Sequence, residues 1–317
     1  MTPAGLRPAT LFFLTLPPLM WASNAIVGRL SVAGGVPLIS PIALNTLRWL
    51  VTLAIVAPIV LVGARRASRR AADAATGTPV RPWRRGDWRV YAVFGLLSVT
   101  SYNALQYMAL RTSSAINVTL IAAGGPLFVL LIGRLFFAAH ARRWAWIGAG
   151  LSLVGVLVVL TGGDVERLAR LRLVRGDLLM VAATVVWALY SWLLLRRRPD
   201  VPVLTLLMLQ TAWGVALSMP VVAVEWLAGD FVLRLELRTA AVVLWVALGP
   251  SLLAYWCWDR GVARAGPLLP SFFANLTPLL AALMSAALLG EPPQAFHAVA
   301  FGLIVLGIVV SQHRARS

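Results

Sequence analysis

Apolar segments of about membrane-spanning length follow one another along almost the whole chain. A helix needs about 20 mostly apolar residues to cross the hydrocarbon core of a bilayer. Windows of this kind lie at roughly 11–31, 38–63, 90–110, 112–137, 144–161, 177–195, 201–226, 239–260, 266–290 and 295–312. The sequence therefore predicts an all-α membrane protein with ten transmembrane helices.

Composition supports this class and excludes others. Hydrophobic residues make up 60% of the 317 residues and charged residues only 12%, far from the balance of a soluble domain. The net charge of +17 comes from arginines in short loops, where lipid headgroups account for it, so we expect a lipid bilayer and no nucleic acid as partner. One cysteine excludes an intramolecular disulfide, and three scattered histidines give no metal motif, so no metal or cofactor is expected.

The second half of the chain faintly repeats the first. Pro126 and Gly155 are echoed 152 residues later by Pro278 and Gly307. Two copies that each cross the membrane an odd number of times must have opposite orientations, which is the symmetry of many secondary transporters. The repeat therefore predicts two inverted five-helix halves.

We place these halves at residues 1–163 and 164–317. Trp21 matches Trp187 at an offset of 166, so the first copy carries extra residues, and the Arg-rich stretch 64–88 is their natural location as a cytoplasmic loop. The same match argues against a cleaved signal peptide, because a discarded leader would not recur inside the chain.

The distribution of arginine sets the expected orientation. Both termini are predicted to be cytoplasmic, most simply in a bacterial inner (plasma) membrane. The segment 162–176 holds four arginines on the opposite side and is the weak point of this topology. The sequence leaves open whether the protein forms a homodimer.

Polar stripes occur at equivalent places in the two copies. Each stripe has i, i+4, i+8 spacing, which places its members on one helix face. The stripes are Ser98, Tyr102, Gln106 and Ser251, Tyr255, Asp259. They could line a central cavity, or merely bond neighbouring helices.

Aromatic, amide and charged residues inside the apolar segments give the candidate substrate-binding set. Its members are Trp21, Asn24, Arg48, Tyr102, Gln106, Asn117, Trp187, Tyr190, Tyr255 and Asn275. Arg48 lies most clearly within a crossing and could contact an anion, pair with a buried carboxylate or extend toward the interface. Asp259 could form an ion pair with Arg260 at the cytoplasmic end.

Helix-breaking residues recur at matching positions. Gly124, Gly125 and Pro126 in the first half and Pro278 in the second are candidate hinges. Bent helices at repeat-related positions are a usual pointer to a transport site, although a kink can also serve packing alone.

Several of these motifs resemble the EamA-like branch of the drug/metabolite transporter superfamily. The similarity is carried by Trp-Ala-Ser-Asn at 21–24, Asn-Thr-Leu-Arg at 45–48, Ala-Leu at 109–110 leading to Pro126, and the run from Pro278 through Gly290-Glu291 to Gly307. It implies ten helices in two inverted repeats around a central cavity, no nucleotide hydrolysis, and movement of small molecules, commonly outward. The first copy departs from the pattern, with Ala138 and Ala139 where the second has Gly-Glu.

The leading functional hypothesis is a secondary transporter that exports small metabolites by alternating access. The alternative within transport is a broad-specificity drug efflux protein, which aromatic lining favours. A polytopic membrane enzyme is disfavoured because no His, Asp and Glu cluster is found, and a scaffold would need no polar stripes. We therefore expect a small-molecule substrate and no catalytic residues.

Overall fold

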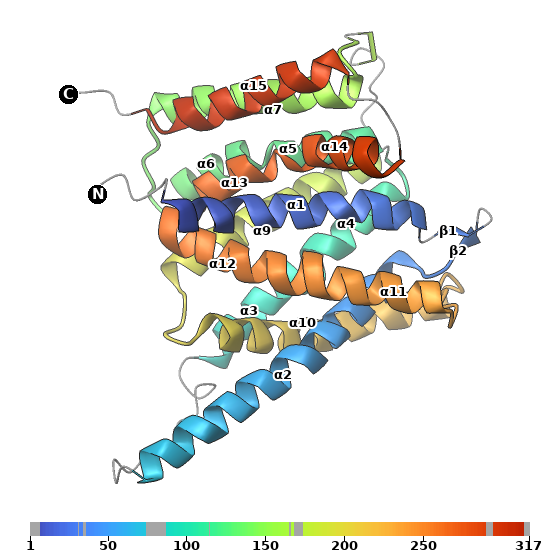
Figure 1. Cartoon of the computed structure of the whole chain (residues 1–317), viewed down its shortest axis with the longest axis vertical. Helices are drawn as coiled ribbons and strands as arrows, with labels where there is room; N and C mark the ends of the chain where they lie inside the picture. The colour runs from blue at the N-terminus through green and yellow to red at the C-terminus, as the bar shows by residue number, and fades with distance from the viewer. Residues whose placement is uncertain are drawn as a thin grey trace.

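The chain folds as a bundle of helices that run roughly side by side, with α2 crossing obliquely (Figure 1). The computed structural model describes residues 7–30, 32–33, 36–73, 87–113, 115–164, 166–167, 174–289 and 294–313. Long apolar side chains such as Phe301 and Val309 are exposed on its surface, as expected where helices face lipid. The prediction of an all-α membrane protein is confirmed.

The elements of the first half begin with one long helix and a small antiparallel strand pair. They are α1 (Pro8–Leu30), β1 (Val32–Ala33), β2 (Val36–Pro37), α2 (Pro41–Asp73), α3 (Trp88–Phe94), the π-helix η3 (Gly95–Ser101), α4 (Tyr102–Leu110), α5 (Ala115–Ala123), α6 (Gly125–Phe136) and α7 (Arg143–Thr161).

The second half follows the same order without the strands. Its elements are α9 (Arg175–Arg196), α10 (Val203–Leu227), α11 (Leu237–Val246), the π-helix η4 (Ala247–Leu253), α12 (Ala254–Ala265), α13 (Leu268–Ala274), α14 (Thr277–Leu289) and α15 (Ala295–Ser311). Within the described ranges, six helices are long and apolar enough to cross a membrane, and seven if the bent pair α5 and α6 is one span.

Helix α2 is longer than the sequence predicts. The stretch 64–88 was expected to be a loop from its first residue, but α2 continues to Asp73 and carries Arg65 and Arg66 on its exposed surface. Alanine and arginine are both strong helix formers, and they continue the helix beyond the apolar window. Residues 74–86 of the predicted loop lie outside the described residues.

Two π-helical turns lie 152 residues apart and interrupt equivalent helices. Turn η3 joins α3 to α4, and η4 joins α11 to α12. A π turn leaves backbone carbonyls without their usual partners, and such turns are frequent at functional sites. The π turns are therefore separated by the same 152 residues as Pro126 and Pro278.

The last helices of the two halves, α7 and α15, lie side by side at one edge of the bundle (Figure 1). A Cβ atom on Gly307 would lie 2.6 Å from the carbonyl oxygen of Gly148, and one on Gly155 would lie 2.9 Å from that of Ala300. The two contacts are equivalent by the repeat, because Gly148 and Ala300 are 152 residues apart and so are Gly155 and Gly307. Small residues let the two backbones approach this closely.

Both halves also break a helix at the same place. The chain bends by 48° between residues 117–123 and α6, at Gly124, and α13 ends just before Asn275 and Leu276. The Asn275 side-chain amide donates to the carbonyl of Ala123, its counterpart 152 residues earlier, at 3.0 Å. A residue that bonds its own counterpart lies near the axis that relates the two halves.

The two ends of the bundle differ in character. Helix α1 begins and α15 ends at one end (Figure 1). Polar contacts join the opposite end, where Arg111 forms an ion pair with Asp230 at 2.8 Å and the Ser40 hydroxyl donates to Glu225 at 2.9 Å. These contacts close that end of the bundle around the termini of α2, α4 and α10.

Candidate functional site

Five aromatic side chains meet around the ring of Trp187. Ring centroids lie 5.8 Å from Trp187 for Trp21, 4.9 Å for Tyr102, 5.4 Å for Tyr190, 5.5 Å for Tyr255 and 5.1 Å for Trp258. We call these six residues the aromatic centre. All five pairs are edge-on or tilted, which suits the charge distribution of aromatic rings.

The aromatic centre draws residues from α1, α4, α9 and α12, so both halves of the chain build it. Tyr190, Tyr255 and Trp258 are buried, whereas Trp21, Tyr102 and Trp187 remain partly exposed. A partly exposed aromatic face backed by buried rings can hold an apolar or aromatic molecule without covalent contact.

Hydrogen bonds from the aromatic centre reach both π turns. The Tyr255 hydroxyl donates to the carbonyl of Ser98 at 2.9 Å, and the Trp21 indole nitrogen donates to that of Pro250 at 3.2 Å. Ser98 and Pro250 are 152 residues apart, and each donor comes from the opposite half of the chain. The π turns therefore supply equivalent acceptors through which each half holds an aromatic side chain of the other.

The serines of the predicted polar stripes do not face a cavity. The Ser98 hydroxyl donates to Phe94 at 2.7 Å and the Ser251 hydroxyl to Val246 at 2.8 Å, both within their own helices. Both serines are fully buried. Serine hydroxyls in helices commonly donate to a carbonyl of the preceding turn, which satisfies them without a partner in a cavity.

Asp259 is fully buried at the edge of the aromatic centre. One carboxylate oxygen, Oδ1, lies 2.9 Å from the Tyr190 hydroxyl, which also lies 3.3 Å from the Gln210 amide oxygen. The predicted ion pair with Arg260 is wrong, because the Arg260 guanidinium lies over the Trp256 ring, 4.1 Å from its centroid. Asp259 is thus held by a neutral hydroxyl and not by a cation.

Arg48 is buried in α2, with its guanidinium carbon 5.3 Å from the centroid of the Trp49 ring. Trp49 in turn packs edge-on against Tyr255 at 4.8 Å. No carboxylate of the described part of the chain lies within 4.0 Å of the Arg48 guanidinium, and its Nε has no hydrogen-bond partner there. Arg48 therefore places a positive charge behind the aromatic centre.

Two of the predicted amides bond to partners outside the aromatic centre. Asn117 donates to both oxygens of Asp177, at 3.2 and 3.1 Å, about 15 Å along α9 from Trp187. Asn275 donates to Ala123 and to the Ser152 hydroxyl at the break between α13 and α14. Both amides hold helix ends together.

Gln106 lies one turn beyond Tyr102 on α4 and is partly exposed. Asn24 lies on α1 beyond Trp21, but its side chain lies outside the described residues. Gly124 is the N-cap of α6 at the break, Gly125 and Pro126 are the first two residues of α6, and Pro278 lies in the first turn of α14.

Sequence reasoning missed Trp49, Trp258 and Gln210. Trp258 lies three residues after Tyr255 and therefore on the same face of α12, a spacing that could have identified it. Gln210 of α10 faces Tyr190 of α9 because both helices pack against α12, and no local pattern predicts that contact.

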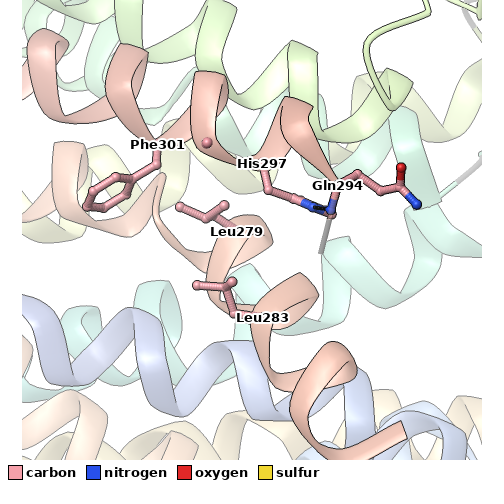
Figure 2. Close-up of a pocket in the computed structure, with 6 residues that line it drawn as sticks. Leu279, Leu283, Gln294, His297 and Phe301 are labelled. Atoms are coloured by element: carbon pink, nitrogen blue, oxygen red, sulfur yellow. Dashed lines mark hydrogen bonds between the residues drawn. The ribbon is translucent and has the colours of Figure 1, made fainter. Parts of the chain in front are cut away.

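A cavity of about 300 Å³ lies elsewhere, between α14 and α15 (Figure 2). Figure 2 shows Phe301 and His297 of α15 on one side and Leu279 and Leu283 of α14 on the other. Leu283 and Phe301 are exposed on the surface, so this cavity opens sideways, toward lipid. It contains none of the predicted substrate-binding residues.

Within the described ranges, no three His, Cys, Asp or Glu side chains are grouped to hold a metal ion.

Similar proteins are transporters by name. The chain is 27% identical to the uncharacterized transporter YyaM of Bacillus subtilis over 221 residues, which cover 70% of this chain and 72% of that protein. It is 26% identical to an uncharacterized transporter of Archaeoglobus fulgidus, over 72% and 80% of the two chains. It is 25% identical to the inner membrane transporter YedA of Escherichia coli K12, over 69% of each.

The fold and the family agree with these relatives. A crystal structure of a protein 23% identical in sequence matches with a TM-score of 0.74 over 96% of both chains, which shows the shared fold. The sequence profile of the EamA-like transporter family matches residues 9–161 and again residues 174–311. The resemblance noted in the sequence is confirmed, and the chain belongs to the EamA-like transporter family.

Proposed function

We propose that this membrane protein is a secondary transporter that works by alternating access around the aromatic centre. In this proposal the chain crosses the membrane ten times, and residues 1–163 and 164–317 form two inverted five-helix halves. The halves rock against each other, so that the aromatic centre faces one side of the membrane and then the other.

The observation that carries the proposal is the pair of hydrogen bonds at the π turns. Tyr255 and Trp21 bind acceptors that are equivalent by the 152-residue spacing, and each bond joins opposite halves. Side-chain bonds to turn carbonyls can be exchanged for bonds to water or substrate without unfolding a helix. This makes the contact suitable for breaking and re-forming in a transport cycle.

The direction we propose is outward, with small metabolites as substrates. Arginine placement supports cytoplasmic termini, and the relative YedA is named as an inner membrane protein. The partly exposed rings of Trp21, Tyr102 and Trp187 suit a compound with an apolar or aromatic part.

The experiment compares metabolites inside and outside cells that lack the protein or overproduce it. An exported compound accumulates inside the deletion strain and outside the overproducing strain. An overproduced Trp187→Ala variant should lose the outward shift. If no compound shifts oppositely in the two strains, export of metabolites is rejected.

Broad drug efflux is a second candidate, favoured by the number of rings in the aromatic centre. Arg48 separates the two candidates, because a buried cation behind the rings favours a substrate with an anionic group. An Arg48→Ala variant should lose export of anionic compounds and keep that of cationic ones. Equal loss for both classes would contradict an anion-binding role for Arg48.

A further inference from the structure

The contacts of Asp259 point to a role that the aromatic centre alone does not explain. Asp259 lies on α12 and is fully buried, and so are Tyr190 of α9 and Gln210 of α10. The three side chains meet where these helices pack together. This polar group, which we call the Asp259 triad, is surrounded by buried aromatic and apolar side chains.

With the amide oxygen of Gln210 toward Tyr190, the hydrogen bonds of the Asp259 triad suit a protonated carboxyl. The Tyr190 hydroxyl lies 2.9 Å from Asp259 Oδ1 and 3.3 Å from Gln210 Oε1, but it has only one hydrogen to donate. If Asp259 is ionised, one of these oxygens faces the hydroxyl without a hydrogen between them. If Asp259 is protonated, it donates to Tyr190 and Tyr190 donates to Gln210, so both contacts are hydrogen bonds.

The charges around Asp259 lead to the same state. No cation of the described residues lies within 4.0 Å of its carboxyl group. On α12, Arg260 and Arg264 lie over the rings of Trp256 and Phe13. Turning the Gln210 amide around would let Nε2 donate to the Tyr190 hydroxyl and Tyr190 donate to an ionised Asp259, so the hydrogen bonds alone do not decide between the two states. Burial decides, because a buried carboxylate without a cation in contact is costly.

Of the other titratable groups near the triad, Arg198 carries a positive charge that acts on Asp259 from beyond 4.0 Å. Tyr255 lies one turn away on α12, and its hydroxyl is bonded to Ser98 on η3. Cys257 is buried beside it. Arg198 follows α9 at the end of the bundle and is partly exposed, and the described side chains of α1 and α13 that pack on α12 carry no charge.

We propose that Asp259 is a proton-binding site whose occupancy couples proton movement to the packing of α10 against α12. This inference rests on the proposed transport function and names its coupling ion. In the described state the site holds its proton. To ionise, Asp259 needs new hydrogen-bond donors. Its Oδ2 and the Gln210 Nε2 are both buried without partners, so a new hydrogen bond between them would supply one.

The ionised state follows from these two atoms. A shift of α10 lets Gln210 Nε2 donate to Asp259 Oδ2 while Tyr190 donates to Oδ1, and water enters to receive the proton. A proton taken from water on one side of the membrane is thus returned to water on the other. The shift of α10 provides the link to the conformational cycle.

Infrared spectroscopy of the purified full-length protein tests the protonation state. At pH 7 the wild type should show the carbonyl stretch of a protonated carboxyl, and Asp259→Asn should lose it. Asp177→Asn is the matched control, because Asp177 accepts from Ser113, Asn117 and the Val174 amide and should be ionised. Tyr190→Phe should shift the band. A band that Asp259→Asn leaves unchanged, or no such band in the wild type, overturns the proposal.

Alkylation of Cys257 by N-ethylmaleimide tests the coupled opening, since this single cysteine lies two residues from Asp259 and is buried. As the pH rises and Asp259 ionises, the wild type should be alkylated faster than Asp259→Asn, which shares the same thiol. Identical pH profiles would overturn the coupling. Neither readout uses a substrate, so both remain valid if the protein transports nothing.

Discussion

The two halves of the molecule touch in two different ways. At α7 and α15 the backbones meet through glycines. A Cβ atom at Gly307 or Gly155 would clash with the facing helix. At the aromatic centre the halves meet through large side chains and through single hydrogen bonds to π-turn carbonyls. A glycine contact has one stable arrangement, whereas rings and single hydrogen bonds can re-pair. The difference suggests that α7 and α15 form the frame against which the centre rearranges.

The largest effect is expected from Gly307→Val. Its Cβ would lie 2.6 Å from the Gly148 carbonyl oxygen, so the helices must separate, at a cost of about 3 kcal/mol. We expect little folded protein and a lower melting temperature. Gly302→Val is the matched control, because Gly302 lies on the same helix with no atom within 4 Å of an added Cβ. Equal melting temperatures for the two variants would contradict the glycine frame.

Trp187→Ala should affect transport more than stability. It removes the ring that five other aromatic side chains contact, and the export rate should fall about tenfold, equivalent to about 1.4 kcal/mol of lost interaction. Trp88→Ala serves as the control, because Trp88 lies on the surface and stacks on Trp213. Export assays on both variants decide whether the effect is specific to the aromatic centre.

Tyr255→Phe and Trp21→Phe test the equivalence of the two π turns. Each removes one hydrogen bond between the halves, at Ser98 or at Pro250, and each should lower the unfolding free energy by about 1 kcal/mol. Both should change the export rate in the same direction. Opposite changes would show that the two turns are not equivalent in the cycle.

The smallest effect is expected from Phe301→Ala. Phe301 lines the lateral cavity between α14 and α15, away from the aromatic centre (Figure 2). Export should remain within about twofold of the wild type, since lipid replaces the ring at an exposed position. A loss as large as that of Trp187→Ala would move the substrate site to the lateral cavity.

Much of the fold could be predicted because membrane helices have a simple signal. Apolar windows located the six or seven helices of the described residues that are long and apolar enough to cross a membrane. Pro126, Pro278, Gly155 and Gly307 indicated the 152-residue repeat. The extension of α2 to Asp73 was missed because it depends on helix propensity outside the membrane and not on hydropathy.

The site was predicted less completely than the fold. Trp21, Tyr102, Trp187, Tyr190 and Tyr255 were selected as aromatic residues inside apolar segments, and the structure brings them together.

Other parts of the site depend on tertiary contacts that no local pattern records. The polar stripes were misleading for a local reason, because the Ser98 and Ser251 hydroxyls donate to carbonyls of their own helices. Asn117 donates to Asp177 because α5 packs against α9.

The most direct test of alternating access uses one cysteine at Gln106, the partly exposed residue one turn beyond Tyr102. In a Cys257→Ala background, Gln106→Cys is treated with a membrane-impermeant maleimide in intact cells and, separately, in inverted membrane vesicles. If the centre opens in turn to each side, the reagent labels this cysteine in both preparations. Labelling from one side only, or from neither, would contradict the account.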